Sequence, residues 1–346
     1  MEEIFRLGEI RCPSGTLVVV DGGHMGLWSG ERSPAQIDPA VLGIDDPELA
    51  AEVLGSVDFA VTGPDASAAA RGFGRQPGAV LHDIPASKAA ELSRMFDEHC
   101  LAEGLDARLE ALPGREPHAR RVRRTAAGGG GGFLIFGVPV VAVGGVPGDR
   151  PLPVLASRFG SGDGMGPRWS EISVRMSEAP VASTVRLGDV GVDWARVLFG
   201  DADALDEWQH DEPVDGLADV AFWGAAAQEA AAAFAAPPLG EPGEEGVLGW
   251  TGLPVAEAVE KAIALERWKE RTGRRIMVDF RPHSHHWQVM RQVRASAGEA
   301  GTVDIGDARL LCAMTGRGDG VFPVSADLDA SGAVVAVRVG FADAIE

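Results

Sequence analysis

Apolar and polar residues follow one another along the chain in short segments, with frequent Gly and Pro between them. Leu17–Val20 and Val57–Val61 are short runs rich in β-branched residues, and turn residues follow both, so both are predicted strands. Lys88–Glu103 carries apolar residues at helical spacing and predicts a helix. Strands and helices therefore alternate in the first half of the chain, as in α/β or α+β proteins.

The second half groups its helices and strands in clumps. Ala225–Ala235 and Val255–Arg271 predict helices, because each ends at turn residues. Ile276–Phe280 predicts a strand, and His285–Ser296 predicts a helix that follows it. The predicted fold class is α+β, with mixed or antiparallel sheets and several packed helices. Inspection of the sequence reveals no internal repeat.

A glycine run divides the chain. We predict an N-terminal half over residues 1–126, a loop or linker over 127–132 and a C-terminal half over 133–346, with one continuous domain as the alternative. Arg120–Arg124 precedes the glycines, and its alternation around Val122 predicts an exposed edge strand guarded by charge. An anion-binding segment is the alternative interpretation of these arginines.

The charge balance excludes some classes of function. The chain has 31 basic and 51 acidic residues and a net charge of −20, which argues against a general nucleic-acid binder. No apolar stretch approaches the roughly 20 residues that a membrane span needs, so no membrane association is expected. The first residues do not resemble a signal peptide, and the three cysteines lack disulfide-like or zinc-like spacing. We therefore expect a cytoplasmic protein.

Several common catalytic motifs are missing from the sequence. There is no GxxxxGK[ST], no GxSxG and no HExxH, and no GxGxxG stands between a strand and a helix. These absences argue against the usual ATP, NAD and serine-hydrolase sites. The chain also has no Tyr, so proton chemistry would fall to His, Asp and Glu.

The main candidate site is a histidine cluster. His283, His285 and His286 lie within four residues, directly after a predicted strand that contains Asp279 and is followed by Arg281. Histidine serves in acid–base catalysis near neutral pH and as a ligand of zinc and related metals. The predicted catalytic residues are these three histidines with Asp279 and Arg281. A divalent metal is one alternative, although no spacing matches a known metal signature, and a purely structural cluster is another.

Further residues are candidates for substrate binding. The segment Asp189–Asp219 holds ten carboxylates and one Arg, and most of it is interpreted as a solvated acidic face. Within it, Asp215 could position His210 as a base. A calcium loop in this segment is excluded, because Leu205 stands where an oxygen ligand is needed.

Two tryptophans complete the predicted binding site. His24 and Trp28 follow a strand in a glycine-flanked loop and offer one polar and one stacking group, with a tight turn as the alternative interpretation. Trp287, directly after the histidine cluster, would supply an apolar wall to a pocket.

Two segments carry a partial resemblance to a known family. Residues 318–341, GDGVFPVSADLDASGAVVAVRVGF, and residues 7–21, LGEIRCPSGTLVVVD, contain the motifs GDG-(Y/F)-P-V and PSG-x-(L/I)-V. These resemble the closing hairpin and the start of an uncharacterised bacterial domain family whose members look like immunity or accessory proteins. The resemblance covers about 40 residues and implies no functional residues.

Two hypotheses follow. The first is a soluble bacterial enzyme of lyase, cyclase or hydrolase type that uses the histidine cluster for acid–base or metal-assisted chemistry on a small molecule. The alternative is a non-catalytic binding or immunity-type protein whose acidic face binds a basic partner. Whether the chain forms a homo-oligomer is left open.

Overall fold

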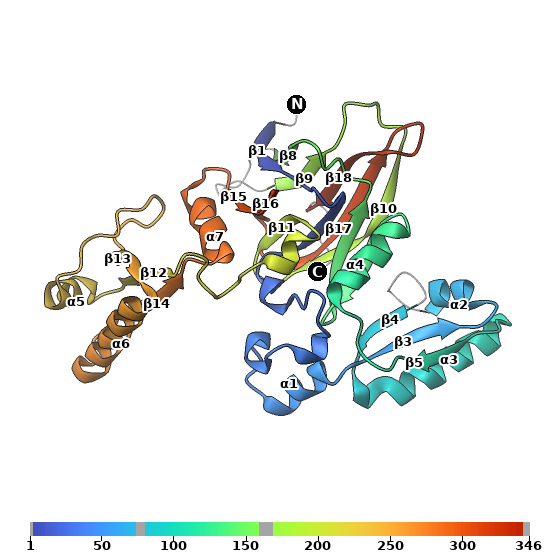
Figure 1. The fold of residues 1–346 in the computed structure, drawn as a ribbon, viewed down its shortest axis with the longest axis horizontal. Helices are drawn as coiled ribbons and strands as arrows, with labels where there is room; N and C mark the ends of the chain where they lie inside the picture. Colours follow the sequence, from blue (N-terminus) through green and yellow to red (C-terminus); the bar gives the residue numbers. More distant parts are fainter. Residues whose placement is uncertain (1–2, 74–79, 159–168, 342–346) are drawn as a thin grey trace. The chain divides into compact units, whose positions relative to one another are not determined.

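The computed structural model describes residues 3–73, 80–158 and 169–341, and it has the α+β fold predicted from the sequence (Figure 1). Its strands are β1 (Ile4–Ile10), β2 (Thr16–Asp21), β3 (Val57–Thr62), β4 (Val80–Ile84), β5 (Arg108–Ala111), β6 (Gly131–Ile135), β7 (Val138–Gly144), β8 (Leu152–Arg158), β9 (Trp169–Arg175), β10 (Ser183–Val192), β11 (Arg196–Asp201), β12 (Leu217–Trp223), β13 (Leu248–Pro254), β14 (Met277–Pro282), β15 (Ala300–Ile305), β16 (Ala308–Met314), β17 (Gly320–Leu328) and β18 (Val334–Gly340). Its α-helices are α1 (Pro47–Leu54), α2 (Ala66–Phe73), α3 (Ala89–Glu103), α4 (His118–Ala127), α5 (Ala227–Phe234), α6 (Val255–Thr272) and α7 (His285–Ala295).

The order of the strands reveals an internal repeat. The two six-stranded sheets run β1-β8-β9-β18-β17-β10 and β15-β16-β11-β2-β7-β6. Each strand from β10 onward can be taken as the counterpart of the strand nine places earlier, so that β10 corresponds to β1 and β18 to β9. With this correspondence, both strand orders read the same from either end. The same correspondence turns the three-stranded sheet β13-β12-β14 into the other one, β4-β3-β5. The chain therefore contains two copies of one fold, β1–β9 (copy 1) and β10–β18 (copy 2), and the expectation of no repeat is wrong.

Residues at equivalent places support this repeat. Arg6-Leu-Gly-Glu-Ile in β1 matches Arg186-Leu-Gly-Asp-Val in β10, and a register shift follows the arginine in both strands. Asp21 and Asp201 end β2 and β11, and Trp28 and Trp208 follow seven residues later in each copy. All of these pairs are separated by 180 positions.

Asp21 and Asp201 bind the two copies to each other. Through one carboxylate oxygen, Asp21 accepts the amide of Gly23 at 2.7 Å, and through the other it accepts the amide of Asp193, in the turn before β11, at 2.7 Å. Asp201 does the same with Asp203 at 3.0 Å and with the amide of Ser14, before β2, at 2.8 Å. Each aspartate thus closes a turn of its own copy and a turn of the other, which ties β2 to β11 where the two strands pair.

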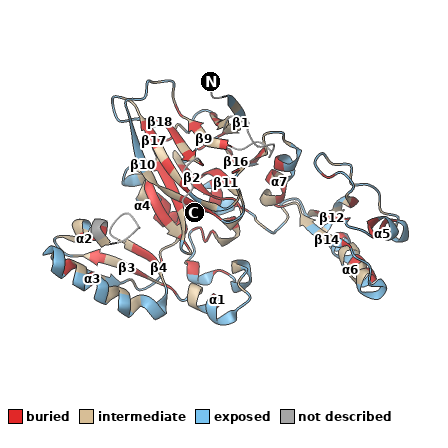
Figure 2. Ribbon diagram, turned by 180° about the vertical axis from the view of Figure 1, so that it is seen from behind, coloured by how far each residue is buried: buried red, intermediate tan, exposed pale blue. Residues whose placement is uncertain are grey.

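The described chain separates into two compact units, residues 1–207 with 304–346 and residues 208–303. The first unit contains copy 1 and most of the two six-stranded sheets, whose strands carry the largest group of buried residues (Figure 2). The second unit is the part of copy 2 that contains the sheet β13-β12-β14 and the helices α5, α6 and α7. There α5 and α6 cover one face of β13-β12-β14, and Phe222, Leu265 and Trp268 lie in its core.

Most predicted elements of the second half are confirmed, with ends that move by a few residues. The two predicted helices are α5 and α6, and left-handed Gly273 ends α6. The helix at His285 is α7, whose first turn is capped by the side chain of Ser284 at the amide of Trp287.

The predicted edge strand at Arg120–Arg124 is wrong. This segment lies in α4, with Val122 and Arg121 fully buried on its inner face and Arg120 exposed. The arginine pattern suits a helix because residues on one face recur every three or four positions. Of the five glycines that follow, Gly131 and Gly132 belong to β6.

Candidate functional site

His283 lies at the start of the histidine cluster, and two carboxylates hold its ring. Its Nδ1 is 3.0 Å from Asp215 and its Nε2 is 2.9 Å from Asp219, the buried third residue of β12. Burial disfavours the charged imidazole, but the hydrogen bonds that His283 donates to Asp219 and Asp215 outweigh this effect and raise the pKa of His283 above its ordinary value. Both ring nitrogens are therefore engaged by carboxylates.

Two pairs of stacked rings accompany this ion cluster in the same segments of the chain. The His283 ring stacks on Trp287 with centroids 4.3 Å apart and an angle of 14° between the planes. His210 stacks on His286 at 4.3 Å and 25°, and the indole N–H of Trp208 donates to Nδ1 of His210 at 3.2 Å. The structure thus brings the three predicted catalytic histidines together with Asp215, His210 and Trp287.

These contacts converge on one segment, residues 209–216, which we call the acidic loop. The amide of Gln209 donates to Nδ1 of His285 at 2.9 Å, and the amide of His285 returns a bond to the carbonyl of Gln209 at 3.0 Å. At the other end of the loop, the amide of Val214 donates to the carbonyl of His283 at 3.0 Å. The stack of His210 on His286 holds the middle. All three neighbouring histidines thus fasten the acidic loop to the start of α7.

Asp279 and Arg281, the other two predicted catalytic residues, belong to a separate ion cluster. Arg281 donates to Asp279 at 2.6 Å and to both carboxylate oxygens of Glu244 at 2.7 and 2.8 Å. Arg294 from α7 lies 3.0 Å from the same glutamate. Because Glu244 is buried, the two arginines compensate its charge, and this cluster stabilises the loop that precedes β13.

His24 and Trp28 lie in the first unit. Nε2 of His24 is 3.3 Å from Asp193, and the indole of Trp28 donates to Asp206 at 2.7 Å. Trp28 is buried against His118 of α4, with ring centroids 5.7 Å apart. The pair Trp28 and His118 has a close parallel in the second unit.

Copy 1 repeats one contact of the histidine cluster. The amide of Ser29, directly after Trp28, donates to Nδ1 of His118 at 3.0 Å, just as Gln209 after Trp208 donates to His285. Trp208 and His285 also lie at 5.9 Å and 44°, against 5.7 Å and 49° for Trp28 and His118. A contact present in both copies belongs to the shared framework. His285 and Trp28 therefore take part in a contact that both copies share, while His283, His210 and His286 occur in copy 2 alone.

The two copies also share one buried aspartate. Asp58 in β3 and Asp219 in β12 each accept a backbone amide of the neighbouring strand, from Asp83 at 2.9 Å and from Gly252 at 2.8 Å. In copy 1 the opposing charge is Arg121, fully buried, which lies 3.3 Å from Asp58 and 3.0 Å from Asp83. In copy 2 the corresponding partner is His283.

Sequence reasoning missed the buried cluster of copy 1. Asp83 is also bound by Arg115 at 2.6 Å, and attraction by Arg121 and Arg115 overcomes the effect of burial and lowers the pKa of Asp83 far below its ordinary value. Burial and repulsion by Arg121 lower the pKa of the neighbouring His118 well below its ordinary value. The available signal was Asp58 itself, a charged residue inside an apolar strand.

No group of three or more His, Cys, Asp or Glu side chains is arranged to hold a metal ion within residues 3–73, 80–158 and 169–341. In the same described part of the chain, no helix is long and apolar enough to cross a membrane. No protein-family model, curated protein or solved structure matches the chain.

Proposed function

We propose that this chain is a non-catalytic binding protein that presents its acidic loop to a basic protein partner. The observation that carries the proposal is that the histidines hold the acidic loop in place. Their rings and backbone fasten residues 209–216, and both ring nitrogens of His283 already face carboxylates. A general base needs a nitrogen that can reach a substrate proton. An anchored loop is instead suited to recognition, because its conformation is set before binding.

The charge of the loop indicates the chemistry of the partner. Asp211 and Glu212 are exposed between the two anchored ends, and the chain as a whole carries −20. A basic partner would be attracted over a distance and then paired with these carboxylates. The partial resemblance to immunity-type domains points to the same class of function.

The enzyme hypothesis stays a prediction, and the same residues test it. Acid–base catalysis by His283 would require Asp215 or Asp219 to release one ring nitrogen when a substrate binds. Metal-assisted chemistry would require the imidazoles to leave their stacking contacts. In either case activity on a small molecule would be abolished by His283→Gln.

The test is titration of the full chain with a lysine-rich peptide by calorimetry at low and high salt. The double variant Asp211→Asn/Glu212→Gln is expected to weaken binding about fivefold, from two lost exposed ion pairs. The control Asp97→Asn/Glu98→Gln removes the same charge from exposed positions of α3 and is expected to bind like the unaltered chain. If both double variants weakened binding equally, the attraction would depend on the net charge alone and not on the acidic loop, which would overturn the proposal.

A further inference from the structure

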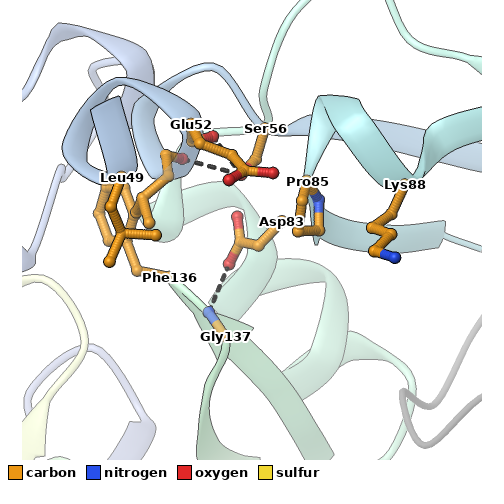
Figure 3. A pocket seen from close by; sticks show the side chains of 9 residues that line it. Leu49, Glu52, Ser56, Asp83, Pro85, Lys88, Phe136 and Gly137 are labelled. Carbon is orange, nitrogen blue, oxygen red and sulfur yellow. Dashed lines mark hydrogen bonds between the residues drawn. The ribbon is translucent and has the colours of Figure 1, made fainter. Parts of the chain in front are cut away.

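A cavity of about 300 Å³ lies in the first unit, against α1 (Figure 3). Its lining comes from α1 and the residues after it, from the end of β4 with the following turn, and from the hairpin between β6 and β7. The lining residues are Leu49, Glu52, Val53, Ser56, Asp83, Pro85, Lys88, Phe136 and Gly137. Its size suits a small organic molecule.

The wall formed by α1 exists in copy 1 only. Trp28 and Asp58 are 30 positions apart, whereas their counterparts Trp208 and Asp219 are 11 apart. The additional segment holds α1 and two short 3-10 helices, Pro34–Gln36 and Pro39–Leu42. One wall of the cavity is therefore formed by a segment that copy 2 lacks.

The opposite wall contains two residues in a backbone conformation that favours glycine. Asp83 has φ 58° and Phe136 has φ 49°. At the equivalent places, copy 2 has Gly252 with φ 63° and Gly306 with φ 55°. The left-handed region is unfavourable for residues with a side chain, and especially for a bulky one such as Phe. Copy 1 thus has two side chains at the cavity, at backbone positions that glycine would occupy with less strain.

Both strained side chains are firmly held. Asp83 is paired with Arg115 and Arg121 and accepts the amide of Gly137 at 3.3 Å, so its charge is compensated inside the protein. The guanidinium of Arg115 lies 4.6 Å from the centroid of the Phe136 ring, on which it stacks. Phe136 therefore forms a fixed apolar surface of the cavity, together with Leu49, Val53 and Pro85.

Glu52 supplies the charge of the cavity. Its carboxylate accepts a hydrogen bond from the hydroxyl of Ser87, and no Lys or Arg of the described residues forms an ion pair with it. Lys88, at the other side, is paired with Glu91 at 3.2 Å. The cavity therefore offers apolar walls and one carboxylate that lacks a cationic partner.

We propose that this cavity binds a small primary amine with an aromatic or branched apolar body. The ammonium group pairs with Glu52, and the apolar body lies against Phe136, Leu49, Val53 and Pro85. Burial of the body supplies affinity, and the charge-assisted hydrogen bond selects a cation. The site is independent of the acidic loop and goes beyond the function proposed for it.

The first experiment is calorimetric titration of the full chain with 2-phenylethylamine, and with 3-phenylpropanoate as the anion of similar shape. The amine is expected to bind with a dissociation constant of about 1 mM or tighter, and the anion is expected not to bind. Glu52→Gln is expected to weaken binding of the amine about tenfold, since it removes an interaction with a charged group. The control Glu48→Gln changes an exposed glutamate of the same helix that does not line the cavity, and should leave binding unchanged.

The second experiment transfers the residue of copy 2 into copy 1. Phe136→Gly is expected to abolish amine binding while the chain remains folded, as followed by circular dichroism, because glycine relieves the strained turn. Leu49→Ala should weaken binding, whereas Leu101→Ala, at an exposed position of α3 outside the cavity, should not. Absence of amine binding, equal binding of the anion, or unchanged binding by Phe136→Gly would each overturn the proposal.

Discussion

The two copies solve one electrostatic problem in different ways. Asp58 and Asp219 occupy equivalent places, both are buried, and both accept an amide of the adjacent strand. Copy 1 balances the charge with Arg121, whose guanidinium stays protonated at any ordinary pH. Copy 2 uses His283, which can lose its proton. The same backbone position is thus permanently compensated in one copy and sensitive to pH in the other.

The comparison also separates framework from candidate function within a single chain. The residues that recur, such as Asp21 with Asp201 and His118 with His285, make the same backbone contacts twice. The residues that differ lie at the acidic loop in copy 2 and at the cavity in copy 1. Differences between copies therefore locate the two sites for which we propose functions.

The largest expected effect is the loss of the permanent charge in copy 1. Arg121→Ala leaves Asp58 without its buried cation and weakens the compensation of Asp83, so it should destabilise the chain by about 3 kcal/mol or more. Urea unfolding followed by circular dichroism measures this change. Arg120→Ala, on the exposed side of the same helix, should change stability by no more than about 0.5 kcal/mol. Similar effects of both variants would show that the buried cluster is not what holds α4.

A smaller effect is expected at the shared histidine. His118→Phe removes the acceptor of the Ser29 amide in a fully buried place and should cost about 1–3 kcal/mol. His285→Phe removes the matching acceptor from Gln209, which is exposed to water, and should cost less. Chemical unfolding of both variants decides the order. A larger loss for His285→Phe would contradict the assignment of a common framework role.

The smallest and most specific effect concerns pH. The pKa of His283 is raised on folding from 6.5. The ion pairs of protonated His283 therefore contribute fully to the free energy of unfolding below about pH 6.5, and this contribution is lost as the pH rises through the pKa of the folded state. Asp215 has a lowered pKa, so its contribution is present above about pH 4 and lost in acid. Burial opposes that lowering, and the bond to His283 outweighs it.

The measurement compares His283→Gln with the unaltered chain by urea unfolding at pH 6 and pH 9. The difference in unfolding free energy should be larger at pH 6, while the effect of Arg121→Ala should be the same at both values. The imidazole signals in an NMR titration report the pKa of His283 directly. A pKa below 6.5 would remove the proposed contrast between the two copies.

The sequence predicted local structure better than it predicted the relation between segments. The helix at Val255 and the strand at Ile276 are found within a residue or two, because helical and β-branched patterns reflect local preferences. The pentapeptide Arg120–Arg124 is too short for its pattern to distinguish the two-residue period of a strand from the helical period. The helix is favoured by the burial of Arg121 against Asp58 and Asp83, which the local sequence does not reveal.

The repeat was missed for a similar reason. The matching residues are 180 positions apart before the additional segment of copy 1, but 161 apart at Asp58 and Asp219 and 167 apart at His118 and His285. The spacing therefore changes along the chain, and few identities lie between. Strand order, which depends on long-range pairing, makes the relation plain. The cavity was unpredictable as well, because its walls come from segments up to about 90 residues apart.

The sequence by itself determined the α+β class, the approximate helices and strands, the strong negative charge and the presence of three histidines beside a predicted strand end. Only the tertiary structure decided what those histidines contact. It places Asp215 and Asp219 at the two ring nitrogens of His283, whereas Arg281 binds Glu244 in a separate ion cluster. Local patterns set the conformation of a segment, whereas the partner of a charged side chain is set by which distant segments pack against it, and that depends on the burial of the whole core.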